Sequence, residues 1–203
     1  MSENSFDSEA LSGESIEDTK QTRNQTEEEK ERDRNKNEED NENGNLNKNK
    51  GLIKSITTAL TMILEENKKL ENYNDIIRKQ NKMVFSANSI PSISIYDYLI
   101  RIQTYSAIEK STLILSLILI DHICKKSKLI LTYYNIHRVL FGSILICIKY
   151  NEDTYYDNKF YSEIAGVKLK ELKNIEYSFL ELNDFNVYIS PDEYLQYQHC
   201  LEQ

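Results

Sequence analysis

The chain divides into two parts by the density of its apolar side chains. Residues 1–50 consist mainly of Ser, Glu, Asn, Asp and Lys, whereas Leu, Ile, Val, Tyr and Phe are dense from Gly51 onwards. A segment with so little apolar surface cannot offset the entropy that it would lose on ordering. We therefore predict a disordered, acidic, low-complexity tail over 1–50, an N-terminal helix with its linker over 51–90, and a folded region over 91–203.

Apolar positions in the second part recur mostly at helical spacing. Only five Gly and two Pro occur in the whole chain, which is too little punctuation for a fold of strands and turns. The predicted class is all-α, with a five-helix bundle from residue 93 to about 183, one helix before it and one after it. In chain order, the expected helices are Leu52 to about Leu70 with a looser stretch to Lys82, Ile95 to about Tyr105, Ile108–Cys124, Thr132 to about Tyr150, Asn158–Gly166, Leu169–Leu182 and a last helix from Ser190.

Residues suited to helix ends separate these segments. Ser92 or Ser94 can cap the first helix of the bundle, and Thr132 the third. The spelling Ser106-Ala-Ile-Glu109 is that of a capping box, which would open the second helix.

Small residues carry further structural information. Gly166 suits a helix C-terminus, and Pro191 after Ser190 suits the first position of the last helix. Gly142 and Ser143 would let a neighbouring helix approach the third helix of the bundle closely.

Charge changes the picture of possible partners. Residues 1–50 hold 15 acidic and 8 basic side chains, a net charge of −7 out of −8 for the whole chain, so the rest is near neutral. Non-specific binding to DNA or RNA requires a basic face, which disfavours a nucleic-acid partner. A protein interface, which depends on shape and a few anchor residues, fits better.

The cysteines indicate neither a disulfide framework nor a zinc site. Cys124, Cys147 and Cys200 are odd in number and far apart, with no CxxC pair. His122 and Cys124 are two positions apart on a predicted helix, so they point in different directions. We expect no metal and no cofactor, and a reducing compartment, the nucleus or the cytoplasm.

No membrane partner is expected either. The apolar run Leu113–Ile120 is shorter than the roughly 20 residues that span a bilayer, and the polar, acidic first residues do not fit a secretory signal peptide.

Five stretches of sequence, in this order and spacing, resemble the cyclin box, and most closely that of the P/U-type cyclins of plants and protists, which are related to the yeast cyclins of phosphate signalling. The stretches are ITTALTMILEENKKL, IPSISIYDYLIRIQTYS, ILIDHICK, NIHRVLFGSILICIKYNEDTYYDNKFYSEIAGV and LNDFNVYISPDEY, and the resemblance covers roughly residues 52–198. It implies a single cyclin box with a C-terminal helix over 91–203. It also implies a protein that is not an enzyme and has no catalytic residues. Such a protein would bind a cyclin-dependent kinase as a 1:1 heterodimer and activate it, in cell division or growth control.

The resemblance also assigns roles to four residues. Arg101 and Asp121 match positions that form a buried structural ion pair between two helices of the box. Lys149 and Glu176 match the pair that hydrogen-bonds the backbone around the movable regulatory helix of the kinase. Without the resemblance, Lys149 is better explained as a lysine near the negative end of a helix dipole than as a contact with a partner.

Two features limit what the resemblance implies. The substrate-docking patch of some cyclins is apolar beside the arginine, where this chain has the polar Gln103 and Thr104, so we expect no such patch. The cyclin fold also serves as an adaptor, or as a transcription-factor-like binding module without kinase activation, and this remains the alternative function.

Overall fold

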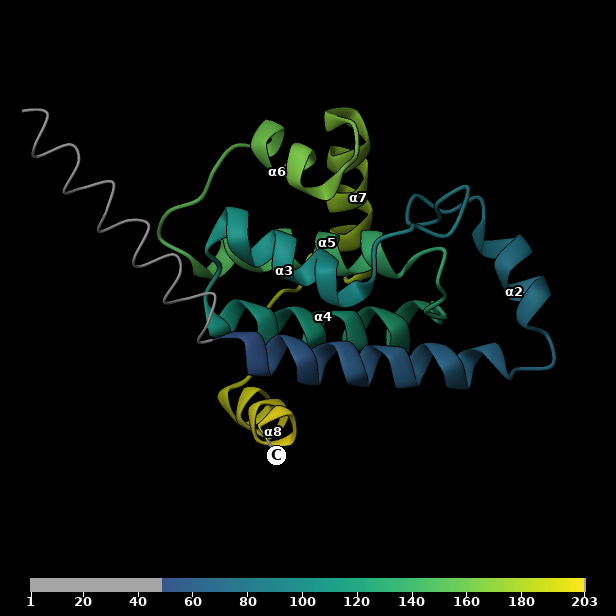
Figure 1. Cartoon of the computed structure of the whole chain (residues 1–203), viewed down its shortest axis with the longest axis horizontal. Coiled ribbons are helices and arrows are strands. Elements are labelled where there is room, and N and C mark those ends of the chain that lie inside the picture. Colours follow the sequence, from purple (N-terminus) through teal and green to yellow (C-terminus); the bar gives the residue numbers. More distant parts are fainter. Residues whose placement is uncertain (1–48, 203) are drawn as a thin grey trace, which may run out of the picture. The chain divides into compact units, whose positions relative to one another are not determined.

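A computed structural model describes residues 49–202, and the predicted tail over 1–50 lies almost wholly outside them (Figure 1). The described chain is helical between its connecting loops and contains no strand, which confirms the all-α class. It is helical over residues 49–68, a segment called helix 49–68 below, so residues 49 and 50 belong to a helix and not to the predicted tail. The other helices are α2 (Tyr73–Gln80), α3 (Ile95–Ser106), α4 (Lys110–Ser127), α5 (Ile136–Asn151), α6 (Asn158–Ala165), α7 (Leu169–Leu182) and α8 (Pro191–Leu201).

The helices α3 to α7 form the predicted bundle, with α5 at its centre. Every residue of α5 from Ile136 to Ile148 is buried except Arg138, because α4, α6 and α7 all pack against this helix. A helix that is apolar on every side is stable only when neighbours cover it all round. The central place of α5 therefore follows from its composition.

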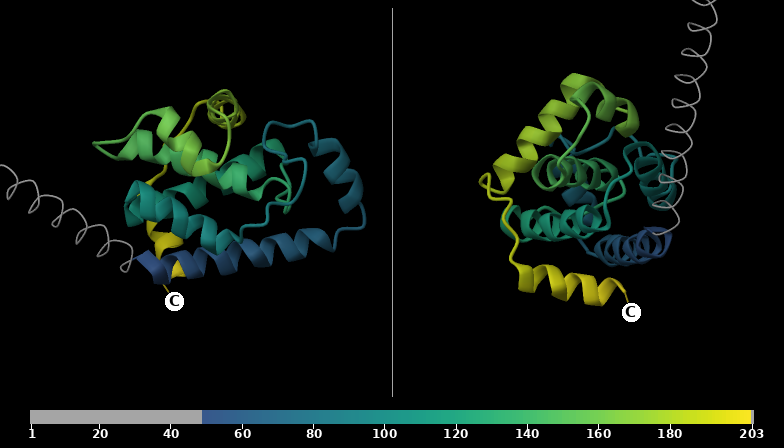
Figure 2. Two further views of the ribbon diagram at one scale, coloured as in Figure 1. Left: turned by 45° about the horizontal axis from the view of Figure 1, so that its top comes forward. Right: turned by 90° about the vertical axis from the view of Figure 1, so that its left-hand side faces the viewer.

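Helix 49–68 lies along α4 and runs in the same direction (Figures 1 and 2). The Asn49 side chain donates to the carbonyl of Ile108, just before α4, at 3.3 Å, and Asn67 donates to the carbonyl of Leu131, just after it, at 3.0 Å. Between these two ends, apolar residues of helix 49–68 such as Ile53 and Leu64 are fully buried in the same core as the bundle.

The helix α8 lies on the outer side of α4 and contributes no fully buried residue (Figure 2). Polar contacts join it to α4, and its half-buried residues Tyr194, Tyr197 and Leu201 pack against the core. The Tyr197 hydroxyl donates to Asp121 at 2.7 Å, and the His122 ring lies 2.8 Å from the Glu193 carboxylate. The predicted start of this helix is confirmed, because the Ser190 hydroxyl accepts the backbone N–H of Glu193.

Two predicted helix starts are wrong by a few residues. The residue before α4 is Glu109, whose side chain makes no capping bond, and Ser106 instead ends α3 with its hydroxyl buried and unpartnered. The residue before α5 is Asn135, not Thr132. Asn135 accepts the backbone N–H of Thr132 through its side chain, so the two residues form a turn that leads into the helix.

The stretch predicted as loose contains a second short helix, α2, which the sequence pattern missed. None of its residues is buried. Its eight residues contain three apolar side chains, Tyr73, Ile76 and Ile77, all of them half-buried, and so short a segment does not establish a helical period.

Candidate functional site: a lysine–glutamate pair on the bundle surface

Lys149 and Glu176 lie together at the surface of the bundle, although 27 positions separate them in the sequence. Lys149 is in the last turn of α5, and Glu176 is in the middle of α7. The Lys149 Nζ atom donates to Glu176 Oε1 at 2.6 Å, and the two side chains are 26% and 17% exposed. The pair is therefore partly shielded from water but still accessible to a partner.

The second oxygen of the Glu176 carboxylate is also held. Asn158, the first residue of α6, donates its side-chain N–H to Glu176 Oε2 at 2.9 Å. This places the carboxylate beside the positive end of the α6 dipole, where a negative charge is favoured. Three helices thus each supply one member of the cluster Lys149, Asn158 and Glu176.

The close approach of α5 and α7 brings the pair together. A Cβ atom on Gly142 of α5 would lie 2.9 Å from Ile175 Cγ2 and 3.4 Å from Phe179 Cδ2 of α7. Only glycine leaves room for this contact, as its small size predicted. Ile175 directly precedes Glu176, so this packing sets the height of the carboxylate along α5.

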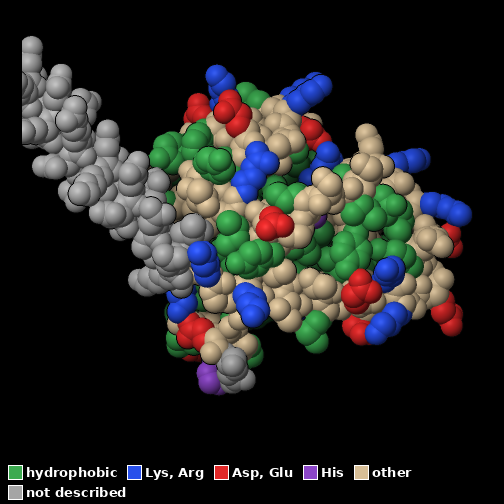
Figure 3. Space-filling model, viewed as in Figure 1, with side chains coloured by type: hydrophobic (Ala, Val, Ile, Leu, Met, Phe, Trp, Pro, Cys, Tyr) green, Lys and Arg blue, Asp and Glu red, His purple; other side chains and the backbone are tan. Residues whose placement is uncertain are grey.

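Exposed aromatic residues lie near the cluster in the sequence and on the surface. Tyr150 follows Lys149 and Tyr177 follows Glu176, and both are more than half exposed, as are Tyr155 and Tyr156 in the loop before α6. Figure 3 shows hydrophobic side chains at the surface in the region of α6. Exposed aromatic side chains are the residues most often used as anchors at protein interfaces.

The predicted buried ion pair between Arg101 and Asp121 is wrong. Arg101 is exposed and donates to the backbone carbonyl of Glu163 on α6 at 2.9 Å. Asp121 points to the other side of the bundle, where Lys125 Nζ lies 2.5 Å away and the Tyr197 hydroxyl donates to it. Burial raises the pKa of Asp121, but these two donors outweigh it and hold the pKa below its ordinary value.

The position of α8 explains why Asp121 does not pair with Arg101. An aspartate on α4 can face α3 or the C-terminal helix, and here the Tyr197 hydroxyl of α8 donates a hydrogen bond to Asp121. Arg101 still links two helices, α3 and α6, through a backbone carbonyl. Gln103 is 2% exposed and donates to the Ile108 carbonyl, so it belongs to the core and not to a surface patch.

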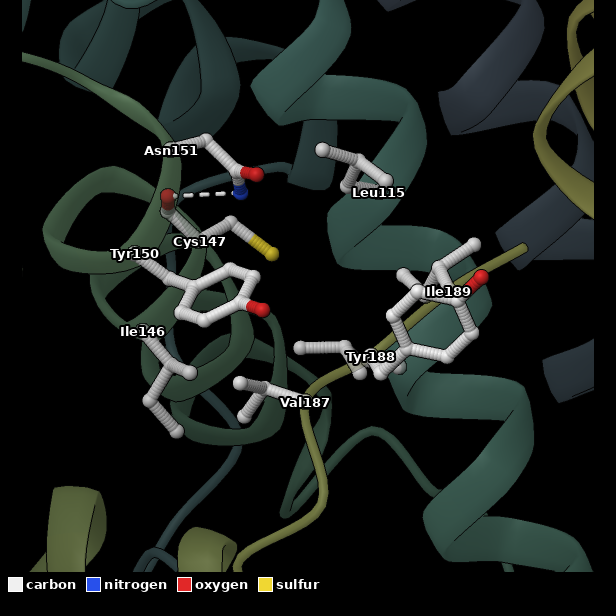
Figure 4. Close-up of a pocket in the computed structure, with 9 residues that line it drawn as sticks. Leu115, Ile146, Cys147, Tyr150, Asn151, Val187, Tyr188 and Ile189 are labelled. Carbon is white, nitrogen blue, oxygen red and sulfur yellow. Dashed lines mark hydrogen bonds between the residues drawn. The ribbon is translucent and has the colours of Figure 1, made fainter. Parts of the chain in front are cut away.

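A small pocket of about 210 Å³ lies between α4, α5 and the segment before α8 (Figure 4). Tyr150 and Cys147 lie on one side of it, and Tyr188 lies on the other. Burial raises the pKa of Cys147 far above neutrality, so its sulfur is a thiol and not the thiolate that nucleophilic chemistry requires. The pocket is also smaller than typical small-molecule sites of about 300–1,000 Å³.

Within residues 49–202, no group of three or more His, Cys, Asp and Glu side chains is placed to hold a metal ion. No helix in the described part of the chain is long and apolar enough to cross a membrane.

The sequence interpretation named two of the three residues in the cluster and missed the role of Asn158. That residue was expected only to begin this helix, and the side chain that caps α6 is that of Asp157, which accepts the backbone N–H of Phe160 at 2.8 Å. The sequence offers one signal for the role of Asn158. The preceding residue, Asp157, can cap the helix, so the side-chain amide of Asn158 is not needed as a cap and can bind another partner.

Five packed helices, α3 to α7, with the apolar α5 at their centre, define an all-helical bundle that carries a charged pair at its surface. The chain belongs to the cyclin family, whose sequence pattern matches residues 10–187.

Known cyclins of plants and fungi are similar to this chain. It is 33% identical over 119 residues to Cyclin-U3-1 of Arabidopsis thaliana, an alignment that covers 59% of this chain and 53% of that protein. It is 35% identical over 121 residues to PHO85 cyclin-like protein psl1 of Schizosaccharomyces pombe, covering 59% and 50%. It is 27% identical over 169 residues to PHO85 cyclin-7 of Saccharomyces cerevisiae, covering 74% and 59%. The chain thus spans about half the length of the first two relatives, and the similarity agrees with a cyclin of the P/U type.

Proposed function

We propose that this chain is the regulatory subunit of a cyclin-dependent protein kinase, which it binds as a 1:1 heterodimer and activates. The observation that carries the proposal is the Lys149–Glu176 pair at 2.6 Å, partly exposed and held by three helices of a cyclin box. Similarity to proteins named as PHO85 cyclins supports the same assignment. The protein itself performs no chemistry in this proposal.

The mechanism rests on hydrogen bonding to the backbone of the kinase. The ends of a helix leave backbone N–H and C=O groups without partners inside the helix. A lysine donates and a glutamate accepts, and charged groups form stronger hydrogen bonds than neutral ones. The pair can therefore hold the end of the movable regulatory helix of the kinase without reading its sequence.

Activation then follows as a population shift. A protein kinase is active when the glutamate of its regulatory helix pairs with the lysine at the ATP site. A partner that binds only the inward position of that helix favours the active state by its differential affinity. The exposed tyrosines beside the pair would add apolar contact area.

The test is an affinity purification of the tagged full-length chain from its own cells, with mass spectrometry and a kinase assay on the eluate. We expect the wild type to recover a cyclin-dependent kinase with activity. The double variant Lys149→Ala, Glu176→Ala should lose it, because truncating an anchor at an interface costs about 2 kcal/mol or more. Equal recovery by both forms would remove these residues from the interface.

The control is Lys170→Ala, which removes an exposed lysine from the first turn of α7. It should recover the kinase as the wild type does. If it loses the kinase too, the loss seen with the double variant is not specific to the Lys149–Glu176 pair.

The alternative function is a cyclin-fold adaptor or transcription-factor-like module that activates no kinase. It predicts that the recovered proteins include no kinase with either form. A gel-shift assay at moderate salt tests the nucleic-acid version, which the near-neutral charge of the chain beyond residue 50 disfavours.

We further propose a nuclear or cytoplasmic location and a role in cell division or growth control. Imaging of the tagged chain through the cell cycle tests both.

A further inference from the structure

We propose that Asn158 is a positioning residue of this site, which fixes the Glu176 carboxylate in the orientation that meets the kinase. The inference rests on the proposed function and extends it to a residue on a third helix. Asn158 is half-buried at the start of α6 and donates to Glu176 Oε2 at 2.9 Å.

The two donors together determine the orientation of the carboxylate. Lys149 alone, at 2.6 Å from Oε1, would leave the carboxylate free to rotate about its last torsion, which is broad for glutamate. Asn158 holds Oε2 and so removes that freedom. A group already held in its bound orientation loses less entropy when the partner arrives.

The cluster keeps hydrogen-bonding capacity for a partner. A carboxylate has about four lone-pair sites and an ammonium has three donors. Over the described residues, the hydrogen bonds of Glu176 use two of those sites, and Lys149 uses one donor for Glu176. Binding a kinase backbone therefore does not require breaking the cluster.

The Asn158 amide is not needed to start α6. Asp157 caps the helix by accepting the backbone N–H of Phe160 at 2.8 Å, and its own carbonyl accepts the N–H of Tyr161 at 3.2 Å. The role of Asn158 toward Glu176 can thus be separated from the stability of α6.

The test uses the cyclin-dependent kinase recovered in the purification above, produced separately, and titrates it with the full-length chain. We expect Asn158→Ala to weaken binding about ten-fold, the scale of a hydrogen bond to a charged group. In a Glu176→Ala background the same change should alter the dissociation constant less than two-fold, because a residue that acts through Glu176 has no effect once Glu176 is gone. If Asn158→Ala acted only by destabilising α6, it would weaken binding in the Glu176→Ala background as well.

Two further variants separate the hydrogen bond from shape and from helix stability. Asn158→Asp keeps the size of the side chain and favours the first turn of α6, but it places a carboxylate against Glu176. It should weaken binding at least as much as Asn158→Ala. Asp157→Ala removes the cap of α6 without touching Glu176, and it should bind within about two-fold of the wild type once the measurement is made well below its melting temperature.

The outcomes distinguish this inference from the proposed function. If the wild type binds no kinase, the proposed function fails and this inference fails with it. If the wild type binds the kinase and Glu176→Ala binds it equally well, the assignment of the pair to the interface fails, and this inference fails with that assignment. If Glu176→Ala weakens binding while Asn158→Ala does not, or if Asp157→Ala weakens it as much as Asn158→Ala, the proposed function stands and the positioning role of Asn158 is overturned.

Discussion

At the scale of single residues, Gly142 connects the fold to the site. It lies on α5 at the point where Ile175 and Phe179 of α7 come closest, and Glu176 follows Ile175 directly. Glycine in a helix interior normally costs stability, about 1 kcal/mol relative to alanine. Here the close helix contact offsets that cost.

Replacing Gly142 with alanine should therefore destabilise the protein. The added Cβ would lie 2.9 Å from Ile175 Cγ2, and such overpacking costs about 1–3 kcal/mol, more than the gain in helix propensity. Chemical denaturation would measure a lower free energy of unfolding. The matched control is Gly51→Ala, where no atom lies within 4 Å of the new Cβ and a gain of up to about 1 kcal/mol is expected. A stabilised Gly142→Ala variant would contradict the tight α5–α7 contact.

His137 is a buried titratable residue of α5. Its ring stacks edge-on against Tyr98, its Nε2 atom lies 3.0 Å from the Ile93 carbonyl, and its Nδ1 atom has no partner among the described residues. Burial lowers its pKa, an effect that the Ile93 carbonyl only partly offsets. The unfolded chain, with a histidine pKa of about 6.5, therefore binds a proton more readily than the folded chain does.

Stability should consequently fall as the pH drops below about 6.5, because the unfolded state takes up more protons there. Above that pH both states carry a neutral ring, and the contribution of His137 is constant. Denaturation of the wild type and of His137→Gln between pH 8 and pH 5.5 would measure the difference. A pH profile unchanged by the substitution would show that His137 is not responsible.

At the scale of helices, burial separates α5 from α8. Almost all of α5 is buried, whereas α8 is held on α4 by the Tyr197–Asp121 and His122–Glu193 contacts and by partly buried side chains. Elements with few buried apolar contacts open locally at lower free energy than the core does. We expect the backbone amides of α8 to exchange hydrogen faster than those of α5.

Tyr197→Phe should increase this difference by removing the hydroxyl that donates to Asp121 at 2.7 Å. Loss of one hydrogen bond to a charged group, about 1–2 kcal/mol, predicts about five- to thirty-fold faster exchange in α8, with exchange in α5 unchanged. Hydrogen exchange with mass spectrometry would measure it. Tyr194→Phe, which removes a hydroxyl with no hydrogen-bond partner in the described chain, is the control and should leave exchange in α8 as it is. Equal effects of the two variants would mean that the Tyr197 bond does not hold α8.

At the scale of the whole described region, residues of helix 49–68 and of α3 to α7 share one hydrophobic core. The core is continuous across these helices, since Ile53 of helix 49–68 and Phe179 of α7 belong to the same buried cluster. A single core of this kind unfolds as one unit in most small proteins.

Calorimetry of the full chain should therefore show one cooperative transition. For residues 49–202 the enthalpy should be on the order of 100 kcal/mol near 60 °C, at about 0.7 kcal/mol per residue. The calorimetric and van't Hoff enthalpies should agree. Two resolved transitions would show that helix 49–68 unfolds separately from the bundle.

The sequence by itself determined the helices that bury a face and the family to which the chain belongs. The helices of the bundle were predictable because apolar positions at helical spacing report burial along one element. The pairing of Lys149 with Glu176 was expected only through the resemblance to cyclins, because no local pattern links two residues 27 positions apart.

The tertiary structure alone decided which polar groups meet. It assigned Asp121 to Tyr197 and Lys125 instead of Arg101, and it brought Asn158 to Glu176. It also contained α2, whose eight residues are too few to establish a helical period in the sequence. Polar contacts of this kind depend on the angles and distances between packed helices, and these are set by side-chain packing across the whole core rather than by the spacing of residues along any one helix.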